Sequence, residues 1–146
     1  MRKSNVWTSV ILVVFLSVFV FGCNKYDKMN ILGAWEIDIK EAKGLDVDSA
    51  KEVLFFKSLP EGSYEQTYEE RTAKWERWTI TGIAERKNNK IAFTNRVKDG
   101  QNKQGDVPFE KYRIEGDKLI LIVKGEGYKD DEKVYTKVPL KVGTGD

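Results

Sequence analysis

Two residue types limit what chemistry this chain can perform, because one occurs once and the other is absent. Cys23 is the only cysteine, and it directly follows Gly22 at the end of a largely apolar run from Val6 to Phe21. Histidine does not occur, which removes the commonest general base, the usual zinc ligand and any Ser-His-Asp or Cys-His site. The sequence therefore predicts a protein that binds rather than an enzyme, and it predicts no cofactor.

Cys23 closes a segment that has the order of a secretory signal peptide. Arg2 and Lys3 come first, the apolar run follows, and a small residue precedes the cysteine. The run is shorter than the ~20 residues of a spanning helix. The segment resembles the lipobox of bacterial lipoproteins, in which the cysteine becomes the first residue and receives acyl chains such as palmitate. The resemblance implies a signal peptide over 1–22, lipidation of Cys23 and a tether over 23–30. The alternative is an uncleaved helix beside a free thiol.

The lipid anchor implies a place at the bacterial cell envelope, because two or three acyl chains hold a membrane stably. Asn24 follows the cysteine and, by analogy with sorting in enterobacteria, favours the outer over the inner membrane where a bacterium has both. Removal of residues 1–22 takes away Arg2 and Lys3 and no acid, so the net charge falls from +2 to 0. A neutral chain argues against nucleic-acid binding, which needs a basic face.

The residues after the tether form short runs of alternating apolar and polar residues, separated by turn residues. At the start, Trp35, Ile37 and Ile39 share one face, which is the pattern of a half-buried strand. The pattern predicts eight strands, over 35–40, 52–57, 63–71, 74–83, 91–97, 109–114, 118–124 and 133–138. Short connections favour antiparallel pairing of neighbours, and closure removes exposed edges. We predict an all-β, up-and-down, eight-stranded antiparallel barrel over 31–140 and a disordered tail over 141–146.

Two stretches of the predicted barrel carry a family resemblance. Gly33 and Trp35 stand in a Leu-Gly-Ala-Trp opening, and the stretch from Tyr112 to Leu119 leads into a hydrophobic strand near the end. Both resemble the lipocalins and the small lipocalin-like domains of bacterial lipoproteins. The resemblance implies structural roles for Gly33 and Trp35. It also implies that Trp35 packs across the closed end of the barrel beneath an arginine from a late strand, for which Arg113 is one candidate.

One predicted inner face mixes aromatic side chains with a few polar groups, as small-molecule pockets do. Its members are Tyr64, Gln66, Tyr68, Trp75, Arg77, Phe93 and Asn95. We predict that these residues bind a small apolar or amphipathic ligand. The alternative is that side chains fill the interior, leaving a structural module whose partner is another envelope or host protein. Arg77 discriminates between the two, because an arginine inside a barrel requires an anion or a carboxylate partner.

Acidic residues gather in two predicted loops, over 130–132 and between Asp99 and Asp106. Carboxylate oxygens are ligands for Ca²⁺, but neither loop has the spacing of a calcium-binding loop. We predict solvated turns at both places and no metal site.

Overall fold

The computed structural model describes residues 31–128 and 131–140. The predicted signal peptide, the tether with Cys23 and the tail over 141–146 lie outside the described residues. The chain divides into two compact units, Met1–Ile31 and Leu32–Asp146, and the barrel belongs to the second. Among the described residues, no helix is long and apolar enough to cross a membrane.

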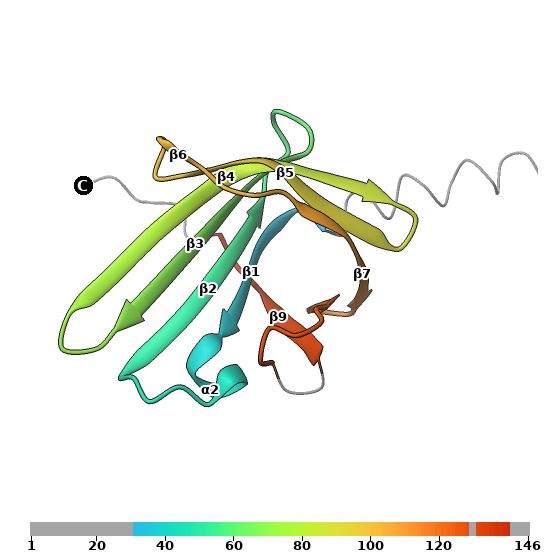
Figure 1. The fold of residues 1–146 in the computed structure, drawn as a ribbon. Coiled ribbons are helices and arrows are strands. Elements are labelled where there is room, and N and C mark those ends of the chain that lie inside the picture. The colour runs from blue at the N-terminus through green and yellow to red at the C-terminus, as the bar shows by residue number, and fades with distance from the viewer. Residues whose placement is uncertain (1–30, 129–130, 141–146) are drawn as a thin grey trace, which may run out of the picture. The chain divides into compact units, whose positions relative to one another are not determined.

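The second unit consists of strands and one short helix (Figure 1). The elements in chain order are β1 (Gly33–Asp38), α2 (Ile39–Lys43), β2 (Ser49–Phe56), β3 (Ser63–Arg71), β4 (Trp75–Lys87), β5 (Lys90–Lys98), β6 (Asn102–Lys103), β7 (Val107–Glu115), β8 (Lys118–Ile122) and β9 (Glu132–Val138). Each of the eight predicted strands corresponds to one of these, and β6 is a two-residue addition beside β5.

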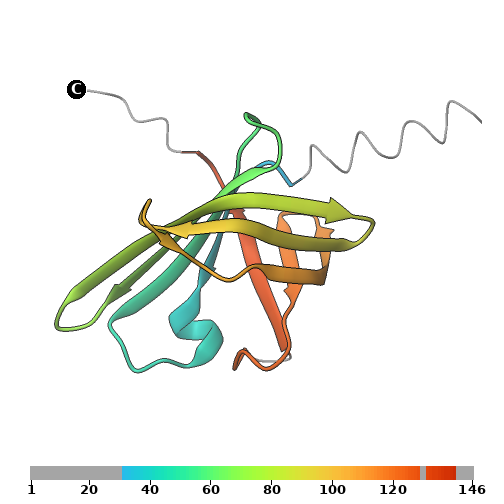
Figure 2. The same ribbon diagram turned by 45° about the horizontal axis from the view of Figure 1, so that its top comes forward.

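The strands close into a barrel. They are ordered β4-β3-β2-β1-β9-β8-β7-β5-β6, and a further pairing between β4 and β5 joins the two sides. Each pairing is antiparallel and connects strands that follow one another in the chain, apart from β5 with β7, which have the short β6 between them, and the closing pair of β1 and β9. The predicted fold, an eight-stranded up-and-down antiparallel barrel, is confirmed. Figure 2 shows the β3–β4 hairpin reaching out from one side of the ring.

The opening strand illustrates how sequence sets local structure. Gly33 has a φ of +107°, a value that side chains with a Cβ rarely adopt. Trp35 and Ile37 then point inward and are buried. β1 ends two residues earlier than predicted, because the carboxylate of Asp38 accepts a hydrogen bond of 2.9 Å from the backbone N–H of Glu41 and caps α2.

The two ends of the barrel differ. Four connections lie at one end, which we call the mouth: the β1–β2 connection with α2, the β3–β4 turn, the β5–β7 connection with β6, and the β8–β9 loop. The opposite end holds the start of β1, the end of β9 and the three remaining connections. Large side chains with almost no exposure fill the barrel between the ends: Trp35, Tyr64, Ile91, Leu119 and Tyr135.

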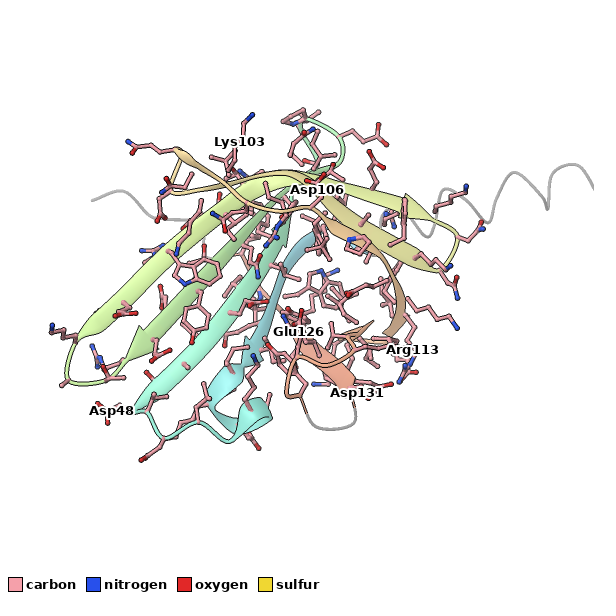
Figure 3. All side chains as sticks on the ribbon, viewed as in Figure 1. Asp48, Lys103, Asp106, Arg113, Glu126 and Asp131 are labelled. Atoms are coloured by element: carbon pink, nitrogen blue, oxygen red, sulfur yellow. The ribbon has the colours of Figure 1, made fainter. Side chains whose placement is uncertain are left out.

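Trp35 is fully buried, and a cation does lie over its ring. The Nζ atom of Lys137 is 5.1 Å from the ring centroid, so β9 supplies this cation and not Arg113. Arg113 lies on the outside of the wall (Figure 3), where its guanidinium binds Glu115 at 2.7 Å and Glu132 at 2.9 Å. The prediction for Arg113 was wrong, because its two neighbours in β7 take the inward positions and the alternation of a strand turns Arg113 outward.

Candidate ligand site inside the barrel

A cavity of about 170 Å³ lies inside the barrel toward the mouth. Five charged side chains line it: Glu52, Arg96, Glu110, Glu126 and Lys133. The rest of its wall is formed by Leu54, Gln66, Phe93, Val107, Leu121, Val123 and Tyr135. Seven of these twelve residues are charged or polar, so the wall is more polar than that of a usual small-molecule pocket, although apolar side chains form the rest.

Glu52 is the most deeply buried charged residue of the cavity, with 4% of its surface exposed. It accepts a hydrogen bond from the hydroxyl of Tyr135, and the Nζ atom of Lys133 lies 3.8 Å from the same carboxylate oxygen. Lys133 also lies 3.5 Å from Glu126. A buried charge is tolerated when it is paired in this way. Glu52, Tyr135 and Lys133 therefore form a mutually satisfied cluster in one part of the wall.

The pKa values in this cluster follow from burial and from the charge of Glu52. Burial lowers the pKa of Lys133, but Glu52, Tyr128 and Glu126 together outweigh burial, so the pKa of Lys133 is raised overall. Burial is the main cause that raises the pKa of Tyr135 well above its usual value, and the carboxylate of Glu52 adds to it. At neutral pH Lys133 is thus a cation and Tyr135 a neutral hydrogen-bond donor.

Arg96 enters the cavity from β5 and has neutral partners. Its Nε donates to the hydroxyl of Tyr64 at 3.1 Å, and its Nη1 donates to the carbonyl of Gly105 at 2.7 Å. Among the described residues, no carboxylate lies within the 4.0 Å of an ion pair with this guanidinium. Arg96 is therefore held in place by two oxygens that leave its positive charge uncompensated by direct contact.

Gly82 makes the placement of Arg96 and Tyr64 possible. A Cβ at this position would lie 2.7 Å from the carbonyl oxygen of Thr94 and 3.0 Å from the ring of Tyr64. The first distance is shorter than real Cβ contacts allow, and its partner is backbone. The close approach of β4 to β5 behind the cavity thus requires a glycine.

Glu110, on β7, resembles Arg96 in that it lines the cavity without an ion-pair partner among the described residues. Its carboxylate makes no hydrogen bond or ion pair with the described residues. Burial raises the pKa of its carboxyl group, the charge of Glu126 raises it further, and Lys133 partly opposes both. The environment of Glu110 would therefore favour an added positive charge.

An aromatic pair stands on the same inner wall next to the cavity. Tyr68 and Trp78 stack with centroids 5.0 Å apart and planes 12° from parallel. Lys98 lies 5.2 Å from the centroid of Trp78, and the Tyr68 hydroxyl donates to Glu70 at 2.5 Å. Both rings are half-buried, so they form a flat, partly accessible surface near the mouth.

Four of the seven predicted ligand residues face inward. Gln66 and Phe93 line the cavity, and Tyr68 belongs to the aromatic pair. Tyr64 is buried, packs on Phe93 with centroids 4.7 Å apart, and holds Arg96. The structure brings these four to one wall, as the strand alternation predicted.

The predicted inward placement of Trp75 and Arg77 was wrong. Tyr68 is opposite Trp78 in the register of β3 and β4, and opposite residues share a face, so the odd-numbered residues here point outward. Trp75 is 61% exposed. The side chain of Arg77 is 59% exposed and lies 3.5 Å from Glu69 on the outer wall. Trp75 and Trp78 have opposite parity in β4, so only one of them can face inward. Trp78 does so, because its ring stacks on Tyr68.

Asn95 was also misplaced, because a bulge interrupts β5. Its φ is +51°, its side chain is exposed, and its backbone N–H donates to Asp106 at 3.1 Å. The pairing of β5 with β4 shifts register here, because the step of three residues from Thr94 to Val97 is matched by a step of only two on β4. The extra residue reverses the alternation, so Phe93 and Arg96 both face inward while Asn95 lies between them on the outside.

Sequence reasoning missed the charged residues of the cavity. Glu52 carried a signal, since its parity in β2 is that of three buried apolar residues, and a charge at such a position needs a partner. Lys133 and Tyr135 occupy one face of β9, which period two alone could have suggested. Arg96 carried no such signal, because the bulge that turns it inward leaves no mark in the alternation.

No family model, no curated protein and no solved structure matches the chain. The fold itself defines the class of protein, which is a closed eight-stranded antiparallel β-barrel, compatible with a lipocalin-like fold. No group of three or more carboxylate, histidine or cysteine side chains in the described part of the chain could hold a metal ion.

Proposed function

We propose that this protein is a lipid-anchored barrel of the bacterial envelope that binds a small amphipathic ligand inside its barrel. The observation that carries the proposal is the charged cavity of about 170 Å³ within a closed barrel. Closed barrels of eight strands have room for side chains or for one small ligand. Here the side chains fill one part and leave the other lined by charges.

The size and polarity of the cavity narrow the ligand. Pockets for drug-sized molecules are roughly 300–1,000 Å³, so this cavity suits a smaller metabolite and not a long acyl chain. Charged groups at five places of the wall disfavour a purely apolar ligand, whose binding would desolvate them without compensation. Of the two ligand types that the sequence predicted, the amphipathic one is the better match.

The anchoring part of the proposal rests on the sequence before residue 31. The basic start, the short apolar run and the Gly22-Cys23 junction support removal of a signal peptide and acylation of Cys23. Binding without catalysis is the mode of action we propose, in keeping with the absence of histidine from the sequence.

The second candidate is an interaction module without a ligand. Its supporting observation is the filling of the barrel by Trp35, Tyr64, Ile91, Leu119 and Tyr135. On this interpretation the cavity contains only water, and an envelope or host protein binds the loops or the outer wall. The charge of Arg96 separates the candidates, since a packing role alone gives no reason for a guanidinium without a carboxylate.

Native mass spectrometry of the full-length protein, extracted from the envelope of a producing bacterium in mild detergent, tests the proposal. We expect a covalent mass increase from acyl chains on Cys23, absent in Cys23→Ser, and a second, non-covalent mass from the ligand. Arg96→Gln should remove the second mass, whereas Arg77→Gln on the outer wall should retain it. An unmodified first residue would refute the anchor. A protein without added mass after incubation with metabolite and lipid extracts would refute binding and favour the interaction module.

A further inference from the structure

We infer that the cavity binds a small zwitterion, a molecule the size of an amino acid whose anionic group meets Arg96 and whose protonated amino group meets Glu110. This inference rests on the proposed function, because it names the class of ligand for the same cavity. Some charges of the wall are compensated within the protein, and two are not.

Three of the charged residues of the wall are compensated within the protein. Lys133 lies near both Glu52 and Glu126, at 3.8 and 3.5 Å, and Glu52 also accepts the hydroxyl of Tyr135. These groups need nothing from a ligand. Of the five charged residues of the wall, Arg96 and Glu110 remain.

The guanidinium of Arg96 has hydrogen-bond donors that the protein does not use. A guanidinium has five N–H donors in a fixed fork, and the hydrogen bonds to Tyr64 and Gly105 use its Nε and one terminal nitrogen. The other terminal nitrogen, Nη2, makes no hydrogen bond with the described residues, and no buried polar side-chain atom among them is left unpaired. Nη2 is therefore accessible, so a carboxylate or similar anion can bind the guanidinium without displacing the bonds that hold it.

The carboxylate of Glu110 is placed where an added cation would be favourable. Burial and the nearby charge of Glu126 raise the pKa of its carboxyl, so a cation beside it would relieve the repulsion. Lys133 is the cation whose charge lowers the pKa of Glu110, and that lysine already pairs with Glu52 and Glu126. A protonated amine from a ligand supplies the missing positive charge.

Arg96 and Glu110 can be bridged by one molecule. Arg96 and Glu110 line one cavity, yet they do not form an ion pair with each other within 4.0 Å, so a gap separates them. A molecule with one charge of each sign bridges this gap and leaves both groups paired. At about 170 Å³ the cavity has the volume of roughly six waters at ~30 Å³ each, which limits the molecule to a few non-hydrogen atoms. Glu126, half-exposed on the β8–β9 loop, marks the side on which the cavity meets solvent (Figure 3).

Isothermal titration calorimetry of the full-length protein in mild detergent tests the inference. The probes are α-amino acids with small side chains and ω-amino acids of increasing length, with acetate, propionate and propylamine as molecules that carry only one of the two charges. We expect a zwitterion to bind at least about 10-fold more tightly than any of the singly charged probes, a difference of about 1.4 kcal/mol. Equal affinity for propionate or propylamine would overturn the inference.

Variants assign the two ends of the ligand. Arg96→Gln and Glu110→Gln should each weaken zwitterion binding at least about 10-fold, whereas Arg77→Gln and Glu69→Gln, which change the same charges on the outer wall, should have no effect. Glu110→Gln keeps the size of the side chain, so the test stands even if Arg96→Gln does not fold. Unchanged affinity in folded Glu110→Gln overturns the inference.

Mass spectrometry of the native protein separates this inference from the proposal on which it rests. A bound ligand that is apolar, or that carries one charge only, overturns the zwitterion and leaves a ligand-binding barrel standing. A protein that binds no probe and no extract component overturns both. A bound mass identified as a zwitterion supports both.

Discussion

Replacement of Glu52 by glutamine should destabilise the barrel more than any comparable change of charge on its surface. The substitution keeps the shape of the side chain and removes its charge. The hydroxyl of Tyr135 can still donate to the amide oxygen, but Lys133, only 13% exposed, loses the more buried of its two carboxylates. Glu126, which remains, is itself about half exposed and holds Lys133 less firmly.

The size of the effect follows from burial. Removal of one partner from a buried ion pair destabilises a protein by about 3–5 kcal/mol, and the remaining contact of Lys133 with Glu126 places Glu52→Gln near ~3 kcal/mol. With a urea m-value of about 2 kcal/mol/M, the unfolding midpoint should fall by roughly 1.5 M. Glu69→Gln is the matched control, because Glu69 pairs with Arg77 and Lys51 on the exposed wall, where a pair contributes about 0–1 kcal/mol.

Urea unfolding followed by tryptophan fluorescence measures both variants at pH 7. A double-mutant cycle with Lys133→Met isolates the pair: the double variant should be more stable than the sum of the single effects by about 1–2 kcal/mol, since it leaves no unpaired charge. A loss of less than about 1 kcal/mol in Glu52→Gln, or additivity in the cycle, would show that the cluster is hydrated and that the burial argument fails.

Three further predictions concern packing and pH. Gly82→Ala should destabilise the barrel by about 1–3 kcal/mol, because its Cβ meets a backbone carbonyl at 2.7 Å; Gly105→Ala, with nothing within 4 Å, should be neutral in the same urea assay. Trp35→Ala should lose about 3–5 kcal/mol because the ring is fully buried, whereas Trp75→Ala on the outer wall should change the melting temperature little; equal losses would contradict the assigned faces. Stability should fall as the pH rises above about 10, since the unfolded chain then releases tyrosine protons that the folded state retains. Tyr135→Phe should make this fall shallower in unfolding curves between pH 8 and 11, and an unchanged slope would contradict the assignment.

The strands were predictable because their signals are local. Alternation such as that of Trp35 and Ile37 needs no partner to be recognised, and turn residues such as Asn88 and Asn89 fix where a strand reverses. The order of the strands followed from short connections, since neighbours in the chain become neighbours in the sheet. The closing pair of β1 and β9 followed from the need to remove two edges.

The residues of the inner wall were harder to predict, because packing against the neighbouring strand decides which face of each strand points inward. In β4, Trp75 and Trp78 give opposite answers, and only the stack on Tyr68 decides between them. In β5 the bulge near Asn95 inverts the pattern halfway along the strand. The sequence thus predicted two of the strands that line the candidate cavity, β3 and β5, but placed Arg77 of β4 inside in place of Arg96.

The charged residues of the cavity are not explained by the needs of the fold. A well-packed apolar group often stabilises a core as much as a buried ion pair or more, and the barrel already has large apolar side chains at its other end. Glu110 goes further, since its raised pKa means that its ionisation disfavours the folded state as the pH rises above the value of an unfolded glutamate. Arg96 adds a cation whose contacts are neutral oxygens. Charged groups that converge on one cavity without a charged partner favour the proposed function, because a ligand of complementary charge would pair with them.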